Sequence, residues 1–374
     1  MNNIFDNIET PVRIAHIAGK LACGGVESVI FNYYRAIDKS KIQFDIYYDA
    51  DSVYEPPEDL IEMGARFIKI PPYQKIWKYI PTLTKKLRKE NYRIIHSHLN
   101  TLSVFPLFAA FCAGIPVRIA HNHSVPAGNE KARNLLKNFL RLFSRVFATH
   151  YAACSEMAGK WLFGESLFNH KKIKIINNAV DFKKFSVSEN RRIFLEEKFS
   201  LENKFVVGHV GRFTYAKNHD RLIDIFRTLK KVSPDTVLLL VGDGELREKI
   251  TEKLMSLDLS DSVIMVGSVS DPEVYYSLMD VMVYPSFFEG LPMACVEAQI
   301  MKVPVIATEA VPEAAIISNG LTYLQLSSSD EEWVDVLSSV SKEKMMLTAN
   351  AEKYNIVSAV KELEQWYACL YRMR

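Results

Sequence analysis

Two glutamates surround the expected start of a helix in the segment YPSFFEGLPMACVEAQ, residues 284–299. Glu289 falls in the loop after a predicted strand, and Glu297 falls within the helix, more than one turn from its start. A carboxylate accepts several hydrogen bonds from sugar hydroxyls, and Gly290 lets a ligand approach the backbone. Pro292 suits the first helical turn, whose free N–H groups attract an anion. The residue types allow equally well a solvated Glu289 and an ion-paired Glu297.

Two cations follow the predicted strand that ends at Val210. They are Arg212 and Lys217, with Gly211 beside them. Arg212 can make a forked contact with a phosphate, and Lys217 can act as a point charge. Such contacts strengthen as charge builds on a departing diphosphate, which accelerates its departure. A solvated basic loop explains the same residues, and residue type alone favours that simpler interpretation.

A glycine pair, Gly24 and Gly25, follows the first predicted strand and opens a helix. The pattern is neither G-x-G-x-x-G nor a P-loop, so a dinucleotide fingerprint is not supported. The pair would let the backbone approach a sugar or a diphosphate, and a plain tight turn is the alternative.

Histidines occur in two H-x-H pairs at predicted strand ends, His96 with His98 and His121 with His123. Four such side chains could hold zinc. No acidic or thiol ligand stands at a supporting spacing, so a hydrogen-bonding role is favoured, with purely structural histidines as the alternative.

Asp49 and Asp51 form a D-x-D pattern after another predicted strand. This pattern stands alone, so we interpret it as a solvated turn. We therefore expect no metal and no cofactor, with Arg212 and Lys217 supplying the positive charge.

Short apolar strands alternate with helical segments along the whole chain, which predicts parallel sheets covered by helices on both faces. The predicted strands are residues 12–17, 44–48, 67–70, 93–96, 117–120, 151–154, 173–176, 205–210, 236–241, 263–266, 281–284, 303–306 and 321–324. A length of 374 residues suggests two domains. We expect an N-terminal domain over residues 1–182, a C-terminal domain over 183–355, and a last helix, 356–374, that returns to the first domain.

The composition is that of an ordinary globular protein. The net charge of +2 does not indicate nucleic-acid binding. Five widely spaced cysteines argue against a disulfide framework, and the polar, acidic N-terminus does not read as a signal peptide. These features predict a cytoplasmic location.

Two segments bear on membranes. The apolar run 102–120 is interrupted by proline, glycine and arginine, so a buried helix followed by a strand is expected. A basic amphipathic helix interleaves cations with apolar residues: Arg133, Lys137, Arg141 and Arg145 with Leu135, Leu136, Phe139, Leu140 and Phe143. It can lie on the anionic inner face of a membrane, and a helix packed through its apolar face is the alternative.

The chain resembles the retaining GT-B glycosyltransferases of family 4, including bacterial members that build polysaccharides. The resemblance extends over nearly the whole chain through the E-x7-E spacing and these segments: LACGGVES (21–28), NNAVD (177–181), HVGRFTYAKNHDRLI (209–223), LLLVGDG (238–244) and VIMVGSVSD (263–271). Ala179 and Lys302 stand where the family usually has glycine, which puts the local turns in doubt.

The resemblance implies two Rossmann-like domains that face each other across a cleft, with the acceptor on the N-terminal domain and a nucleotide sugar, expected to be a UDP-sugar, on the C-terminal one. Glu289 would orient the donor sugar, and Glu297 would hold the ribose. Arg212 and Lys217 would bind the diphosphate, and His121, with His123 as the fallback, would contact the sugar. The remaining donor-binding positions would be Gly24, Gly25, Gly267, Ser268, Gly290 and Leu291.

Three functions remain compatible with these observations. Transfer of a hexose or N-acetylhexosamine to a glycan or lipid-linked acceptor, with retention, is the favoured hypothesis. A nucleotide-sugar 2-epimerase of the same fold and a non-catalytic sugar-binding protein are the alternatives.

Overall fold

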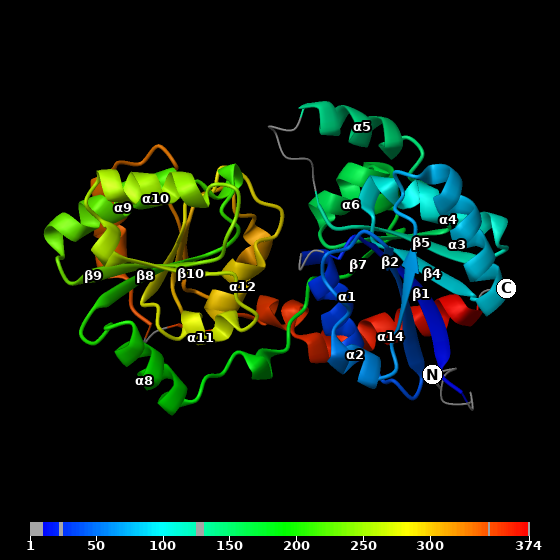
Figure 1. Ribbon diagram of the computed structural model, residues 1–374, viewed down its shortest axis with the longest axis horizontal. Helices are drawn as coiled ribbons and strands as arrows, with labels where there is room; N and C mark the ends of the chain where they lie inside the picture. Colours follow the sequence, from blue (N-terminus) through cyan, green and yellow to red (C-terminus); the bar gives the residue numbers. More distant parts are fainter. Residues whose placement is uncertain (1–9, 22–24, 125–130, 343–344, 373–374) are drawn as a thin grey trace. The chain divides into compact units, whose positions relative to one another are not determined.

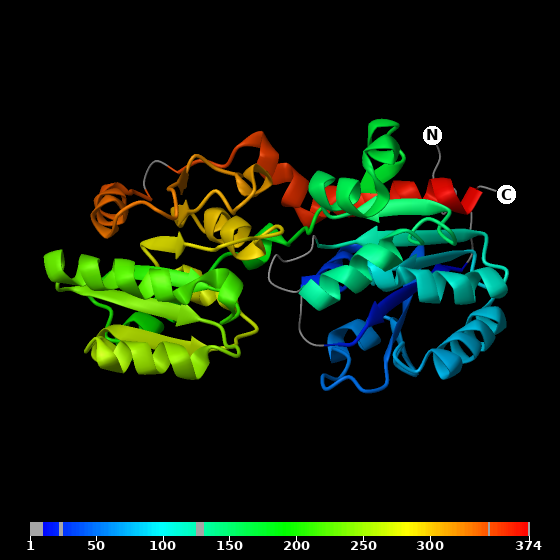
Figure 2. The same ribbon diagram turned by 90° about the horizontal axis from the view of Figure 1, so that it is seen from above.

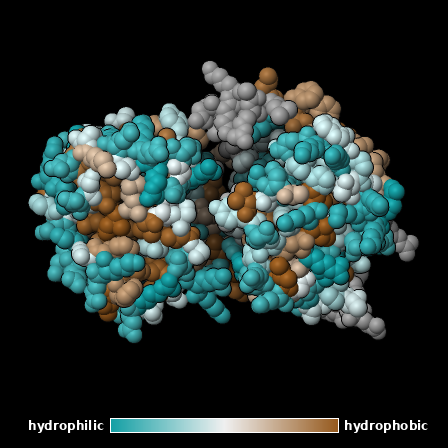
Figure 3. Space-filling model, viewed as in Figure 1, coloured by the Kyte–Doolittle hydropathy of each residue, from teal (hydrophilic) through white to brown (hydrophobic). Residues whose placement is uncertain are grey.

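The computed structural model describes residues 10–21, 25–124, 131–342 and 345–372, without the side chains of residues 131–134 and 136. The chain divides into two compact units. The first holds residues 1–181 and 353–374, and the second holds residues 182–352. Figure 3 shows a surface on which hydrophilic residues surround smaller hydrophobic areas.

In the part of the first unit that the structure describes, seven parallel strands form one sheet in the order β3-β2-β1-β4-β5-β6-β7 (Figure 1). Their bounds are β1 (Val12–Gly19), β2 (Ile42–Asp49), β3 (Arg66–Ile70), β4 (Ile94–Ser97), β5 (Val117–Asn122), β6 (His150–Ala153) and β7 (Ile173–Ile175). Because the strands are parallel, their carboxyl ends meet along one edge, where loops can carry functional side chains.

Helices cover both faces of this sheet. They are α1 (Gly25–Ala36), α2 (Glu58–Glu62), α3 (Ile76–Glu90), α4 (Val104–Cys112), α5 (Lys131–Arg141), α6 (Glu156–Phe163), α7 (Glu165–Asn169) and α14 (Ile356–Arg372). One core joins α1 and α14 to the sheet, and a second core joins α3, α4 and α6 to its other face. The last helix therefore belongs to the first unit, and its Tyr367 is fully buried there.

The described part of the second unit has a six-stranded parallel sheet in the order β10-β9-β8-β11-β12-β13. Its strands are β8 (Phe205–Val210), β9 (Thr236–Val241), β10 (Val263–Gly267), β11 (Val281–Tyr284), β12 (Val305–Ala307) and β13 (Leu321–Tyr323). Its helices are α8 (Glu189–Lys198), α9 (His219–Val232), α10 (Arg247–Ser256), α11 (Pro272–Tyr276), α12 (Met293–Ile300) and α13 (Asp330–Ser339). Figure 2 shows α9 and α10 beside this sheet, and their apolar faces share a core with α13.

Each strand predicted from the sequence is present, and all pairings within the two sheets are parallel. The apolar run 102–120 forms α4 and β5, as expected, and among the described residues no helix is both long and apolar enough to span a bilayer. The described cysteines, Cys112, Cys154, Cys295 and Cys369, are all free.

Local details differ from the sequence-based expectations at two positions. Asp49 is not solvated: it ends β2 with 3% exposure, and burial raises the pKa of its carboxyl to about 6. Its neighbour Asp51 is half exposed and pairs with Lys20, so the two carboxylates differ in environment. Pro292 is the N-cap of α12 rather than a residue of its first turn.

Lys302, which stands where the family usually has glycine, adopts a φ of +57°. This left-handed conformation costs a non-glycine residue roughly 1–2 kcal/mol. The turn after α12 therefore keeps the backbone geometry that a glycine would favour.

Candidate functional site

The second unit brings Lys217 and Glu289 together at the carboxyl edge of its sheet. Lys217 Nζ lies 2.8 Å from Glu289 Oε1 and 3.0 Å from Oε2, and it also donates to Tyr284 Oη at 2.6 Å. The two residues follow β8 and β11, which are neighbours in the sheet. Strand adjacency therefore creates a contact between residues 72 positions apart.

Backbone contacts hold the two loops in register. Phe287 N donates to Ala216 O at 2.9 Å, and Asn218 Nδ2 donates to Pro285 O at 3.1 Å. Asn218 has a φ of +53° and caps α9 by accepting from Arg221 N. The loops thus present the ammonium and the carboxylate from a fixed backbone.

The Lys217–Glu289 pair is largely withdrawn from water, since the side chains are 16% and 8% exposed. Removing one partner of a buried pair leaves an uncompensated charge, which is strongly unfavourable. This ammonium could bind phosphate oxygens, and this carboxylate could accept from hydroxyls, if a ligand replaced the contact between them.

Arg212 lies in the loop after β8 but does not join this pair. Its side chain is 76% exposed, and its nearest carboxylate is Glu245 at 3.7 Å. Close packing constrains the backbone next to it, because a Cβ on Gly242 would lie 2.0 Å from Gly211 O. The backbone is therefore held while the guanidinium stays accessible to a ligand.

Glu297 lies on α12 and accepts a hydrogen bond from Tyr276 Oη at 2.9 Å. Burial raises the pKa of its carboxyl to about 7, and the Tyr276 hydrogen bond opposes that shift. Burial therefore brings the protonation of this carboxyl into the neutral pH range.

The other predicted donor-binding residues lie in both units. Gly267 ends β10 with a φ of +89°, and its carbonyl accepts from Gly242 N at 2.8 Å. Ser268 and Gly290 are exposed, and Leu291 is partly buried. In the first unit, Gly25 is the exposed first residue of α1, whereas Gly24 lies outside the described residues.

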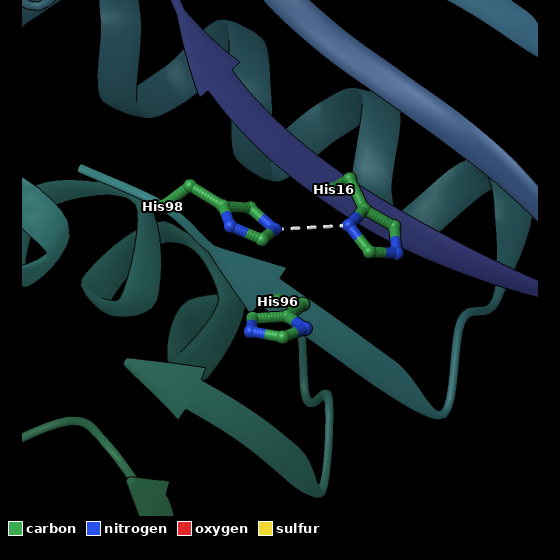
Figure 4. Close-up of side chains that lie close together, drawn as sticks. All are labelled: His16, His96 and His98. Carbon is green, nitrogen blue, oxygen red and sulfur yellow. Dashed lines mark hydrogen bonds between the residues drawn. The ribbon is translucent and has the colours of Figure 1, made fainter. Parts of the chain in front are cut away.

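In the first unit, the histidines of β4, β5 and their loops meet a fifth one, His16 of β1. His16 Nδ1 lies 3.0 Å from His98 Nε2, as Figure 4 shows, and His98 Nδ1 lies 2.9 Å from His123 Nε2. Separately, His96 Nε2 lies 3.1 Å from His121 Nδ1. The five side chains therefore form two hydrogen-bonded chains.

These imidazoles are neutral in the folded protein. Burial lowers the pKa of His16 and of His123 to about 3, and it lowers the pKa of His96, His98 and His121 well below the usual value. Two groups have nitrogens close enough to share a metal ion: His16, His96 and His98, and His98, His121 and His123. Neutral imidazoles are the protonation state that a zinc ion requires.

Comparison with known sequences identifies the family. Residues 23–184 match Glycosyltransferase Family 4, and residues 190–356 match Glycosyl transferases group 1. The Bacillus subtilis (strain 168) protein named as glycosyltransferase EpsF is 32% identical over 87% of this chain and 86% of its own length. The chain belongs to the family 4, group 1 glycosyltransferases.

Two further similarities extend over the length of this glycosyltransferase. The Escherichia coli UDP-Gal:alpha-D-GlcNAc-diphosphoundecaprenol alpha-1,3-galactosyltransferase is 24% identical over 95% of the chain and 96% of its own length. The structure of Anabaena Alr3699/HepE in complex with UDP and glucose matches with a TM-score of 0.73 and 18% identity, covering 95% of both chains. Together with the two parallel sheets, this similarity shows that the fold is GT-B, with two Rossmann-like domains.

Two residues that contact this candidate site were not predicted from the sequence. Tyr284 is fully buried and receives the Lys217 hydrogen bond. His209 stacks on Tyr284, with ring centroids 5.0 Å apart, and its Nδ1 donates to Val283 O at 2.8 Å. Tyr284 directly precedes the PSFFEGLP loop, so its place at the strand end was an available signal. His209 looks like any strand residue, and only packing reveals its contact.

Proposed function

We propose that this glycosyltransferase moves a hexose-type sugar from a UDP-sugar to a glycan or lipid-linked acceptor in polysaccharide or glycoconjugate synthesis, with retention of anomeric configuration. The observation that carries the proposal is the Lys217–Glu289 pair at the carboxyl ends of β8 and β11. A sugar diphosphate has negative phosphate oxygens next to sugar hydroxyls. The Lys217 ammonium can bind the phosphate oxygens, and the neighbouring Glu289 carboxylate can accept hydrogen bonds from the hydroxyls. The names of the E. coli and Anabaena relatives, which include UDP and a diphospholipid, support this substrate class.

When the donor binds, Lys217 and Glu289 give up their contact with each other, and each binds a different part of the donor. The ammonium turns to the phosphate oxygens, and the Glu289 carboxylate accepts from the sugar hydroxyls. Arg212, which is exposed in the same loop, adds a forked contact to the diphosphate. These two cations carry the charge that a divalent metal supplies in other transferases, so the transfer is metal-independent. The departing diphosphate accepts the proton of the attacking hydroxyl on the same face of the sugar.

A panel of nucleotide sugars, incubated with undecaprenyl-diphosphate-linked GlcNAc and with EDTA present, tests the proposal. We expect one donor to give a new glycosidic bond and free nucleoside diphosphate. Conversion of the donor sugar to its 2-epimer without transfer would instead identify an epimerase. Binding of free sugar without any nucleotide dependence would identify a sugar-binding protein.

The affinity for the donor should depend on the protonation of Glu297, because only its carboxylate can accept from both ribose hydroxyls. Its pKa of about 7 means that binding must remove a proton below that pH. Since one pKa unit corresponds to about 1.36 kcal/mol, the dissociation constant for the nucleotide should rise by up to about tenfold from pH 7 to pH 6. Isothermal titration calorimetry measures this dependence.

Glu297→Gln is expected to bind more weakly than the wild type at pH 8 and to show no change between pH 8 and pH 6. The matched control is Glu273→Gln, which removes the nearby α11 carboxylate that raises the pKa of Glu297. That variant should move the transition to lower pH. A pH-independent affinity in the wild type would contradict the ribose-binding role of Glu297.

A second part of the proposal concerns the membrane, where a lipid-linked acceptor would be located. Of the apolar residues on the basic helix, Leu135 is 74% and Phe139 57% exposed, whereas Leu140 is buried, so only part of its apolar face packs against the protein. Leu142, directly after α5, is 72% exposed. The cations Lys137 and Arg141 lie on α5 with Leu135 and Phe139. Exposed apolar side chains interleaved with cations favour an anionic lipid surface.

Replacing Leu135, Phe139 and Leu142 together with glutamine should lower binding to phosphatidylglycerol vesicles by at least about tenfold, because each apolar side chain contributes on the order of 1.5–3 kcal/mol when fully buried. Vesicle co-sedimentation measures the effect. The control is Val232→Gln, which changes a 69% exposed apolar residue in the other unit. Equal binding by the triple variant and the wild type would exclude α5 as the contact.

A further inference from the structure

A buried hydrogen-bond chain links the last helix to His121 within the first unit. Tyr367 Oη of α14 lies 2.7 Å from His96 Nδ1, and His96 Nε2 lies 3.1 Å from His121 Nδ1. Tyr367 is 0%, His96 2% and His121 1% exposed. His121 Nε2, at the end of this chain, is buried without a hydrogen-bond partner among the described residues. The chain therefore joins a residue near the C-terminus to one of the predicted sugar contacts.

The direction of the chain follows from Tyr367. Within the part of the chain that the structure describes, its hydroxyl has no hydrogen-bond acceptor other than His96. If the hydroxyl accepted from His96 instead, its own proton would stay buried with no other acceptor among the described residues, whereas the His121 Nε2 proton that the opposite direction leaves can be donated to a ligand oxygen. Burial also raises the pKa of Tyr367 well above its usual value, so the proton stays on the phenol. Tyr367 is thus the donor at the start of the chain.

Each later proton position then follows from the tautomer rule for a neutral imidazole, in which one nitrogen donates and the other accepts. His96 accepts at Nδ1 and therefore carries its proton on Nε2. It donates that proton to His121 Nδ1, which leaves the His121 proton on Nε2. The end of the chain is an N–H group that can bind an acceptor oxygen.

We propose that Tyr367 and His96 are positioning residues that hold His121 as its Nε2–H tautomer, so that this imidazole donates a hydrogen bond to an oxygen of the bound substrate. The inference rests on the proposed function for the identity of that ligand. It specifies what His121 Nε2 binds: an oxygen that accepts a hydrogen bond, and neither a hydrogen-bond donor nor a metal ion. His123 is the more exposed of the two, and its ring centroid lies 3.9 Å from that of His121.

The ring geometry favours this chain over a shared metal ion. A metal is bound along lone pairs that lie in the ring planes, so ligand rings must converge on one point. His96 and His98 instead stack face to face, with centroids 4.3 Å apart and planes 24° apart. The second chain, from His16 through His98 to His123, has no tyrosine at its end, and both of its terminal nitrogens lack partners among the described residues. Its tautomers are therefore not set by an anchoring donor.

The test is a tautomer assignment by long-range ¹H–¹⁵N NMR on the full chain labelled with ¹⁵N-histidine. In the wild type we expect His121 to be protonated at Nε2 and unprotonated at Nδ1. Tyr367→Phe removes the anchoring donor, so both His121 tautomers should appear. The control is His16→Phe, which alters the second chain and should leave the His121 tautomer unchanged. A wild-type signal from protonated Nδ1, or no change in Tyr367→Phe, would overturn the proposal.

Kinetics provide a second readout. His96→Ala should lower kcat/KM for the donor by at least tenfold, whereas His96→Gln should recover most of that loss because its amide N–H can still donate to His121 Nδ1. Equal defects in the two variants would indicate a merely structural role. Stoichiometric Zn²⁺ binding that abolishes the His121 Nε2–H signal would also overturn the proposal. Because the tautomer is measured without turnover, a chain that lacks transferase activity but retains the tautomer pattern would refute the proposed function alone.

Discussion

Lys217→Ala is expected to lower kcat/KM for the nucleotide sugar by about 10²–10³-fold, the range found when one preorganised donor is removed from a developing charge. Lys217 Nζ is the cation held between Glu289 and Tyr284, and its side chain is 16% exposed. Without it, the Glu289 carboxylate loses its counter-ion and repels the diphosphate. The loss should appear in turnover as well as in binding, because the charge on the diphosphate grows as the sugar departs. Steady-state kinetics with the preferred donor measure both.

Two variants separate this role from general loss of positive charge. Arg212→Ala should also lower turnover strongly, because the proposed function assigns its guanidinium to the same diphosphate. Lys249→Ala removes a lysine on α10 that is 62% exposed and paired with Asp220, so it should leave the kinetics nearly unchanged. If Lys217→Ala retained near-normal turnover while folding normally, the diphosphate would be bound elsewhere.

Glu289→Gln is expected to lower kcat by at least about 10²-fold while leaving UDP affinity unchanged or improved. The amide keeps the shape of the side chain but removes the charge that, in the proposed function, orients the sugar hydroxyls and stabilises positive charge on the reacting carbon. It also releases Lys217 from an ion pair with contacts of 2.8 and 3.0 Å. The freed ammonium can then turn to the diphosphate without first breaking that pair.

Calorimetry with UDP and single-turnover kinetics with the donor test the two halves of this prediction separately. Glu245→Gln is the matched control, since that carboxylate is 58% exposed and lies beside Arg212 at 3.7 Å. Weaker UDP binding by Glu289→Gln would show that the carboxylate supports the nucleotide site instead of the sugar. Normal kcat in a folded variant would remove Glu289 from the chemistry.

Much of the fold could be predicted from local sequence, because continuous apolar strands that alternate with helices are compatible with few architectures. The strands ending at Val210 and Tyr284 were predicted at their observed ends. Adjacency of strands in the sheet then brought the Lys217 loop to the Glu289 loop. The periodicity of the sequence does not reveal which strands are neighbours in the sheet. The family resemblance, and not the periodicity, assigned Lys217 and Glu289 to one site.

The sequence did not predict how exposed individual side chains are or which distant residues they contact. Asp49 was interpreted as a solvated turn carboxylate and lies 3% exposed, and the apolar residues of the basic helix, for which the sequence left a membrane face and a packed face open, include both exposed and buried side chains. In both cases the exposure depends on neighbours that are distant in the sequence. His16 and Tyr367 stand in no motif, so nothing in their local sequence indicates that they contact the H-x-H pairs.

By itself, the sequence determined the two parallel-sheet domains, the family, and the residues that could bind a charged sugar donor, because strand patterns and motif spacing are properties of nearby residues. The tertiary structure decided that Lys217 is paired with Glu289. It also decided that His121 lies at the end of a chain that begins at Tyr367. Hydrogen bonds between residues 72 and 271 positions apart depend on how the strands and helices pack, which no local pattern specifies.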